Sequence, residues 1–146
     1  MILTSEQKLF RDSLESFLSS KLPIAALRSL RDASLSTAYD RGVWQQLAAL
    51  GVSSITVPTA FGGAEFGWLA MGAVAQEMGR RLSPTPLLSS VVLAQGALIN
   101  CANLDQINHY LPALLNGDEI WAVAFEERAH FSPDSVSTAM TPRGLS

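Results

Sequence analysis

The sequence predicts an all-α fold, a multi-helix bundle of orthogonal or up-and-down type, with the start of a β-domain at its C-terminal end. Apolar residues recur at helical spacing through most of the first 117 positions. Two consecutive segments, 66–82 and 87–102, are apolar almost all round, as expected of buried helices in a layered domain. After Gly117 the period changes, because 120–125 is a short apolar run behind a Gly-Asp turn.

The N-terminal segment is expected to form an amphipathic helix behind a cap. Thr4 and Gln7 have the spacing of a capping box, and apolar side chains then recur on one face as far as about Lys21. A short second helix is expected from Pro23 to about residue 30, because proline is tolerated in the first turn of a helix.

A third helix is expected between Asp40 and Gly51. Asp40 can accept hydrogen bonds from the first helical amides, and Gly51 can take the left-handed conformation that ends many helices. Trp44 and Leu47 lie on its apolar face.

The segment that leads to the central helices reads "VSSITVPTAFGG", residues 52–63. Its first part is predicted to be extended, because it is β-branched and because Pro58 restricts the residue before it. The stretch from Val57 to Gly63 is interpreted as a rigid link, in which Pro58 fixes the approach and Gly62 and Gly63 allow the turn.

The first central helix, 66–82, contains many small residues and is expected to pack on several sides. It becomes polar only near its C-terminal end, at Gln76, Glu77, Arg80 and Arg81. The "SPTP" sequence at 83–86 separates it from the second central helix, 87–102, in which we expect the lone Cys101 to be a buried apolar residue.

The last helix is expected to begin at Asn103 or Asp105 and to end at Gly117. Pro112 lies inside its apolar pattern, so a kink or a new turn is expected there. The run 120–125 then reads as a β-strand, which requires a neighbouring strand to satisfy its hydrogen bonds. Residues 119–146 are therefore predicted to begin a β-domain.

The composition excludes several classes of function. The net charge is −3 and the ten basic residues are scattered, so nucleic acid is not an expected partner. A single cysteine allows no disulfide within the chain. No apolar stretch is long enough for a membrane span and no secretory signal is recognised, so a cytoplasmic protein is expected. Charged residues make up only 16%, which indicates that part of the surface packs against another domain or subunit.

The short motifs of the chain identify no chemistry. Gly62 and Gly67 have the spacing of a phosphate-binding loop, but Trp68 and Leu69 stand where that loop needs lysine and a hydroxyl residue. Glu127 and His130 form a Glu-x-x-His unit, yet a di-iron centre needs two such units. The more ordinary interpretation of His130 is a solvated loop residue, and no metal site is predicted.

Taken together, the order and spacing of several short segments are more specific than any single motif. Trp44-x-x-Leu47-x-x-x-Gly51 is followed by "ITVPTAFGGAEF", "AVAQEMGRRLSPTP" and "QINHYLPALLNGDEIWAVAFEE". In order and spacing, from about residue 4 to residue 127, the sequence resembles the N-terminal half of the flavin-dependent acyl-CoA dehydrogenase family.

This resemblance implies an α-helical N-terminal domain over 1–118 and the truncated beginning of a β-barrel middle domain over 119–146. It implies FAD as cofactor, an acyl-CoA thioester as substrate, α,β-desaturation as the reaction, and a homo- or hetero-oligomer. Because the family's catalytic glutamate belongs to a C-terminal domain, no residue of this chain receives a catalytic role.

The resemblance also implies two groups of binding residues. Pro86, Ser89, Ser90 and Leu93 correspond to the helix that lines the acyl-tail pocket. Ala124 and Phe125 correspond to the flavin-facing positions of the family's "A-x-T-E-P-x-x-G-S-D" strand.

That strand departs from the family pattern in this chain. Phe125 replaces the threonine and Glu127 the proline, Glu126 matches the glutamate, and Ser132 and Asp134 remain of the Gly-Ser-Asp turn.

The leading hypothesis is the N-terminal part of an FAD-dependent acyl-CoA dehydrogenase-like protein that supplies the wall of the acyl-tail pocket. Two alternatives stay open. One is a non-catalytic divergent subunit, a helical interaction module that has lost flavin binding, which would suit the altered strand motif. The other is a flavin monooxygenase on the same scaffold.

Overall fold

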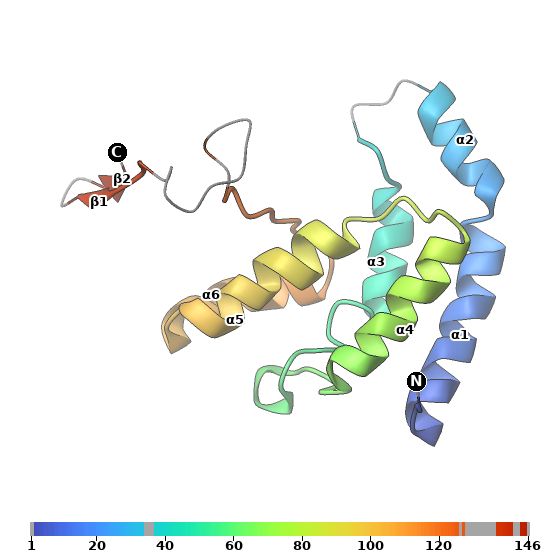
Figure 1. Ribbon diagram of the computed structural model, residues 1–146, viewed down its shortest axis with the longest axis horizontal. Helices are drawn as coiled ribbons and strands as arrows, with labels where there is room; N and C mark the ends of the chain where they lie inside the picture. The colour runs from blue at the N-terminus through green and yellow to red at the C-terminus, as the bar shows by residue number, and fades with distance from the viewer. Residues whose placement is uncertain (1, 34–36, 126, 128–136, 142–143, 146) are drawn as a thin grey trace.

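The computed structural model describes residues 2–33, 37–125, 127, 137–141 and 144–145. Their secondary structure is mainly helical (Figure 1). The elements, in chain order, are α1 (Ser5–Lys21), α2 (Ile24–Asp32), α3 (Arg41–Ala49), the 3₁₀ turn η1 (Thr59–Phe61), α4 (Gly67–Arg80), the π-helix η2 (Leu87–Gln95), α5 (Gly96–Cys101), α6 (Leu104–Leu115), β1 (Met140–Thr141) and β2 (Gly144–Leu145).

The helices enclose two apolar clusters. In the first, α1 lies along α4 and both pack with α3 and η2, with Leu14, Trp44 and Val74 among the buried side chains (Figure 1). The second lies around α5 and α6, where Leu98 and Leu111 are buried. The predicted all-α fold class is confirmed.

Side chains cap three helices at the predicted positions. The Thr4 hydroxyl accepts from the Gln7 amide, and the Gln7 side chain accepts in turn from the Thr4 amide. The Asp40 carboxylate accepts from the amide of Val43 at the start of α3. Of the two candidates for α6, Asn103 is the cap, and it forms a second capping box with Gln106.

Two glycines end helices in the left-handed conformation, as expected. Gly51 follows α3 with φ 104°, and Gly117 follows α6 with φ 73°. Of the two possibilities predicted at Pro112, a new turn is wrong, because α6 continues through it to Leu115, and a kink stays a prediction. Pro112 and Asn108 are both exposed, so water can bond the Asn108 carbonyl that the proline leaves without an amide donor.

The extended conformation predicted before Pro58 is also wrong. Residues 51–56 form consecutive turns, in which the Ser54 amide donates to Gly51 and the Val57 amide donates to Ser54. The turns bury Val52 and Ile55 in the first cluster and Val57 in the second. Tertiary burial of these side chains thus overrides their β-propensity.

The link from Val57 to Gly63 behaves as predicted, but its two adjacent glycines act differently. Gly62 has φ 81° and open space around it. Gly63 lies so close to Val57 that a Cβ there would collide with the Val57 carbonyl group. One glycine therefore provides the turn and the other provides the close approach.

The Glu65 carboxylate supports the same link. It accepts hydrogen bonds from the Thr59 amide at 3.1 Å and the Thr59 hydroxyl at 2.9 Å. These bonds lower the pKa of Glu65 below its ordinary value, because they favour the charged form.

The first central helix is packed on one face rather than on several sides. Ala70, Met71 and Val74 of α4 are buried, whereas Trp68 is 59% exposed and Leu69 is 45% exposed. The apolar composition of this segment predicted a helix enclosed on several sides. Trp68 and Leu69 instead face outward, and no described element covers them.

The β-strand predicted at 120–125 is not formed, since these residues have neither helical nor strand structure. Among the described residues the only β-ladder pairs Met140 with Leu145 and Thr141 with Gly144, at the far end of the tail (Figure 1). A strand is defined by bonds to a neighbouring strand, and no described segment offers them to 120–125. The division at residues 118 and 119 stays a prediction.

Candidate functional site

The predicted acyl-tail residues lie where the chain turns from α4 into η2. Leu82 takes a left-handed conformation with φ 50°, and the Ser83 amide donates to the carbonyl of Met78, which closes α4. Pro86 then starts the next helix and is buried. The proline-rich turn therefore acts as the predicted helix break.

The nine residues of η2 form a π-helix, which the sequence did not indicate. The wider turn carries side chains to a given face at longer intervals than an α-helix does. Leu88 and Leu93, five residues apart, are both exposed, by 65% and 40%. Such segments occur frequently at functional sites, so η2 is the best candidate for a ligand-facing wall.

The structure divides the four predicted tail-lining residues between two environments. Ser89 is half-buried and its hydroxyl donates to the Pro86 carbonyl at 3.3 Å, whereas Leu93 faces outward. Pro86 is buried, and Ser90 is only 2% exposed. Leu93 and part of Ser89 are thus available at the surface, while Pro86 and Ser90 lie behind it.

The hydroxyl of Ser90, one of the predicted tail-lining residues, connects η2 to the segment that leads to the predicted flavin-facing residues. It accepts a hydrogen bond from the backbone amide of Trp121 at 3.3 Å. Ala124 and Phe125 follow three and four residues later, and both are exposed, Phe125 by 51%. Sequence reasoning missed this link, because only the fold brings Ser90 and Trp121 together.

Other residues of the altered strand motif are described only in part. Glu126, His130, Ser132 and Asp134 lie outside the described residues. The Glu127 carboxylate accepts from the Ser137 hydroxyl and amide, both at 2.6 Å, and from the Thr138 amide. These bonds, that from the Ser137 side chain foremost, lower the pKa of Glu127 to about 2.

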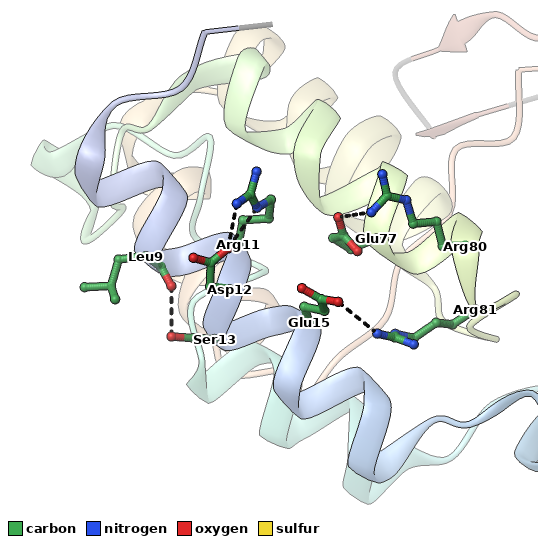
Figure 2. Close-up of polar contacts among 8 residues, drawn as sticks. All are labelled: Leu9, Arg11, Asp12, Ser13, Glu15, Glu77, Arg80 and Arg81. Atoms are coloured by element: carbon green, nitrogen blue, oxygen red, sulfur yellow. Dashed lines mark hydrogen bonds and ion pairs between the residues drawn. The ribbon is translucent and has the colours of Figure 1, made fainter.

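A charged groove of about 450 Å³ lies between α1 and α4. Figure 2 shows its ion pairs: Arg80 to Glu77 at 3.0 Å, Arg81 to Glu15 at 3.5 Å, and Arg11 to its neighbour Asp12 at 2.7 Å. The hydrogen bond and charge of Asp12 raise the pKa of Arg11. Arg80 and Arg81 thus hold acidic side chains rather than standing free in solvent.

Within the polar end of α4, which the sequence predicts, Glu77 is the residue that is buried. The residue is 3% exposed, and its second carboxylate oxygen is buried without a hydrogen-bond partner among the described residues. Its position one turn after Ala73 and Val74, on the buried face of the same helix, was the available signal.

The described residues contain no cluster of three or more histidine, cysteine, aspartate or glutamate side chains suited to a metal ion. Cys101 is exposed at the end of α5, so its expected burial is wrong, because the second central helix turns its C-terminal end to solvent. The candidate site thus consists of the exposed apolar face of η2 and, beside it, the segment that Trp121 joins to Ser90. No nucleophile or base is assigned to it.

No helix among the described residues is both long and apolar enough to cross a membrane.

The sequence also matches a known protein family over most of its length. Residues 4–118 match the family described as acyl-CoA dehydrogenase, N-terminal domain. Acyl-CoA dehydrogenase FadE27 of Mycobacterium tuberculosis is 35% identical over 106 residues, which are 73% of this chain and 28% of that protein.

Solved structures share the fold. The ChsE4-ChsE5 complex of Mycobacterium tuberculosis contains a chain that matches 99% of this one, with a TM-score of 0.82 and 28% identity. An acyl-CoA dehydrogenase complexed with FAD, from Bacillus anthracis, matches 88% with a TM-score of 0.74; at 20% identity this likeness concerns the fold alone. The chain covers 38% and 22% of those two chains, so it spans well under half of the relatives it matches.

The family match over residues 4–118 and the identity to FadE27 establish that this chain belongs to the acyl-CoA dehydrogenase family, of which it provides the N-terminal helical domain.

Proposed function

We propose that this chain is the N-terminal part of an FAD-dependent acyl-CoA dehydrogenase-like protein and supplies one wall of its acyl-tail pocket. The observation that carries the proposal is the outward apolar face of η2, beside the hydrogen bond that ties η2 to the segment leading to Phe125. Leu88 and Leu93 expose apolar surface there, and an acyl chain or a further domain would remove it from water.

In this proposal Leu93 and Ser89 contact the acyl tail, while Pro86 and Ser90 shape the wall behind them. Leu93 is the residue best placed to influence tail length, because it is apolar and 40% exposed. The Ser89 hydroxyl already donates to Pro86, so it does not leave an unpaired polar hydrogen facing an apolar ligand.

Ala124 and Phe125 would face the flavin. FAD, when bound, accepts the hydride that leaves the acyl chain during desaturation. The exposed phenyl ring of Phe125 offers an aromatic surface for packing but no hydroxyl to bond the flavin edge. The residues therefore fit a flavin through ring contact and backbone groups.

Assembly with further polypeptide is part of the proposal. The chain carries no assigned base, and the ChsE4-ChsE5 relative is described as a complex of two components. We propose that this protein likewise works in a homo- or hetero-oligomer, with acyl-CoA as its small-molecule partner. The replacement of the family's threonine by Phe125 favours one alternative, a divergent subunit that supports a flavin-competent partner.

Titration of the longest native polypeptide that contains these residues with FAD tests the proposal. A bound yellow flavin that is bleached by an acyl-CoA thioester is the expected result. Colourless protein in a tight hetero-oligomer would favour the divergent subunit. Bleaching followed by oxygen-dependent hydroxylation of the product would favour a monooxygenase.

A further inference from the structure

Residues 117–121, here called the exit segment, lead out of α6 and are held by three different helices. Gly117 lies against Trp44 and Ala48 of α3, close enough that a Cβ at position 117 would stand 3.2 Å from the Trp44 indole. Asp118 is held at two points, because Arg41 donates to its carbonyl at 2.7 Å and Gln45 donates to its carboxylate at 3.2 Å.

Trp121 is held at the other end of the exit segment. Its amide donates to Ser90 of η2, its indole Nε1 donates to the Glu119 carboxylate at 2.8 Å, and its ring lies 5.0 Å from that of Tyr110 on α6. Ile120 packs on the first apolar cluster and Trp121 on the second, so adjacent side chains are anchored in both cores.

Residues 122–125 follow directly after this held end, and their side chains are exposed. We propose that Ser90 is a positioning residue: its buried hydroxyl, together with Arg41 on α3, fixes the exit segment and so sets where Ala124 and Phe125 stand relative to the acyl-tail wall. The inference rests on the proposed function, because it assigns those two residues to the flavin.

The assignment gives the two neighbouring serines different tasks. The Ser89 hydroxyl donates to Pro86, three residues earlier at the start of its own helix, whereas the Ser90 hydroxyl bonds a residue 31 positions away. A hydroxyl buried to 98% needs a partner, and the Trp121 amide provides one. Loss of that hydroxyl frees the exit segment, while loss of the Ser89 hydroxyl does not.

The test compares Ser90→Ala with Ser19→Ala in the longest native polypeptide; the exposed Ser19 hydroxyl donates to the Glu15 carbonyl within α1, away from the proposed site. Hydrogen exchange of the 120–125 amides, measured by mass spectrometry, reports the anchor directly. Loss of one hydrogen bond is expected to speed exchange at Trp121 by about fivefold in Ser90→Ala. The Kd for FAD, followed by quenching of flavin fluorescence, should rise by a similar factor, while Ser19→Ala leaves the exchange rate and the Kd within about twofold of wild type.

A second pair of variants covers the case in which the buried Ser90 cannot be changed without unfolding. Arg41→Met removes the exposed donor to Asp118, and Arg31→Met is its control, because the exposed Arg31 pairs with its neighbour Asp32 on α2 and bonds no residue of the exit segment. Arg41→Met should speed exchange of the exit segment and weaken FAD binding in the same direction, and Arg31→Met should change neither.

The proposal is overturned if Ser90→Ala and Arg41→Met leave exchange at 120–125 unchanged, or if both speed exchange without weakening FAD. A wild-type protein that binds no FAD would instead contradict the proposed function, and the exchange data alone would then decide whether Ser90 anchors the exit segment.

Discussion

At the scale of single residues, the adjacent glycines of "VPTAFGG" illustrate two separate requirements for the absence of a side chain. Gly62 is needed for its positive φ, since nothing lies within 4 Å of the place where a Cβ would stand. Gly63 is needed for contact, since the Val57 carbonyl occupies that place. Both requirements concern the conformation and packing of the chain in this link.

Alanine substitution should separate these two requirements. Gly62→Ala is expected to lower the free energy of unfolding by about 1–2 kcal/mol, the usual cost of a left-handed L-residue. Gly63→Ala should lower it by about 3 kcal/mol or more, because backbone rather than a flexible side chain must move. Urea unfolding monitored by circular dichroism measures both values. Equal losses in the two variants would contradict this distinction.

At the scale of elements, η2 is held against the core by a buried amide. Gln95, at the end of η2, is 1% exposed and donates through Nε2 to the Ser53 carbonyl at 2.8 Å. The Ser53 hydroxyl donates in turn to the carbonyl of Leu115 at the end of α6. A π-helix, the turns at 51–56 and the last helix therefore share one polar connection, which fixes the orientation of the proposed wall.

Gln95→Glu should make stability strongly dependent on pH. Burial and the facing Ser53 carbonyl would raise the pKa of the new carboxyl above its unfolded value, so the folded state would bind the proton more tightly. Stability is then retained at low pH and lost as pH rises above the unfolded pKa, by about 3 kcal/mol at pH 7.

Urea unfolding of Gln95→Glu at pH 4 and pH 7 measures this loss. Gln46→Glu is the matched control, because the Gln46 amide also donates to a backbone carbonyl, that of Gly42, but is exposed. It should show little change between the two pH values. A Gln95→Glu protein as stable at pH 7 as at pH 4, relative to wild type, would contradict the buried connection.

At the scale of the whole molecule, the two apolar clusters of the helices also include side chains that follow the boundary predicted at residue 118. Ile120 and Trp121 pack on the two apolar clusters, and Ser90 and Tyr110 hold Trp121 from η2 and α6. We propose that the functional boundary lies after Trp121, where the side chains turn to solvent.

Truncation tests that boundary. A chain of residues 1–118 should lose roughly 2 kcal/mol or more of stability relative to 1–125, because it lacks two partly buried apolar side chains. A chain of residues 1–125 should unfold at nearly the same temperature as a chain of residues 1–146, since a short two-stranded hairpin adds little stability. Thermal unfolding of the three chains checks both expectations. Equal stability of the chains 1–118 and 1–125 would contradict a boundary after Trp121 and support the boundary predicted at residue 118.

Local sequence patterns are enough to predict most of the helices, their caps and their order. Capping at Thr4, Asp40 and Asn103, and termination at Gly51 and Gly117, depend on hydrogen bonds and backbone conformations within a few residues, so local patterns predict them. The spacing of these signals also identified the family, which the match over residues 4–118 confirmed.

Which apolar and polar groups meet, by contrast, depends on how the helices pack together. Val52 and Ile55 carry a strand propensity but lie in turns, because burial in the core outweighs a local preference. Glu77 lies in the polar end of α4 and is nevertheless buried. The strand predicted at 120–125 is replaced by an irregular segment in which the Trp121 amide donates to the Ser90 hydroxyl. These outcomes depend on contacts between positions far apart in the chain, which propensity and periodicity do not contain.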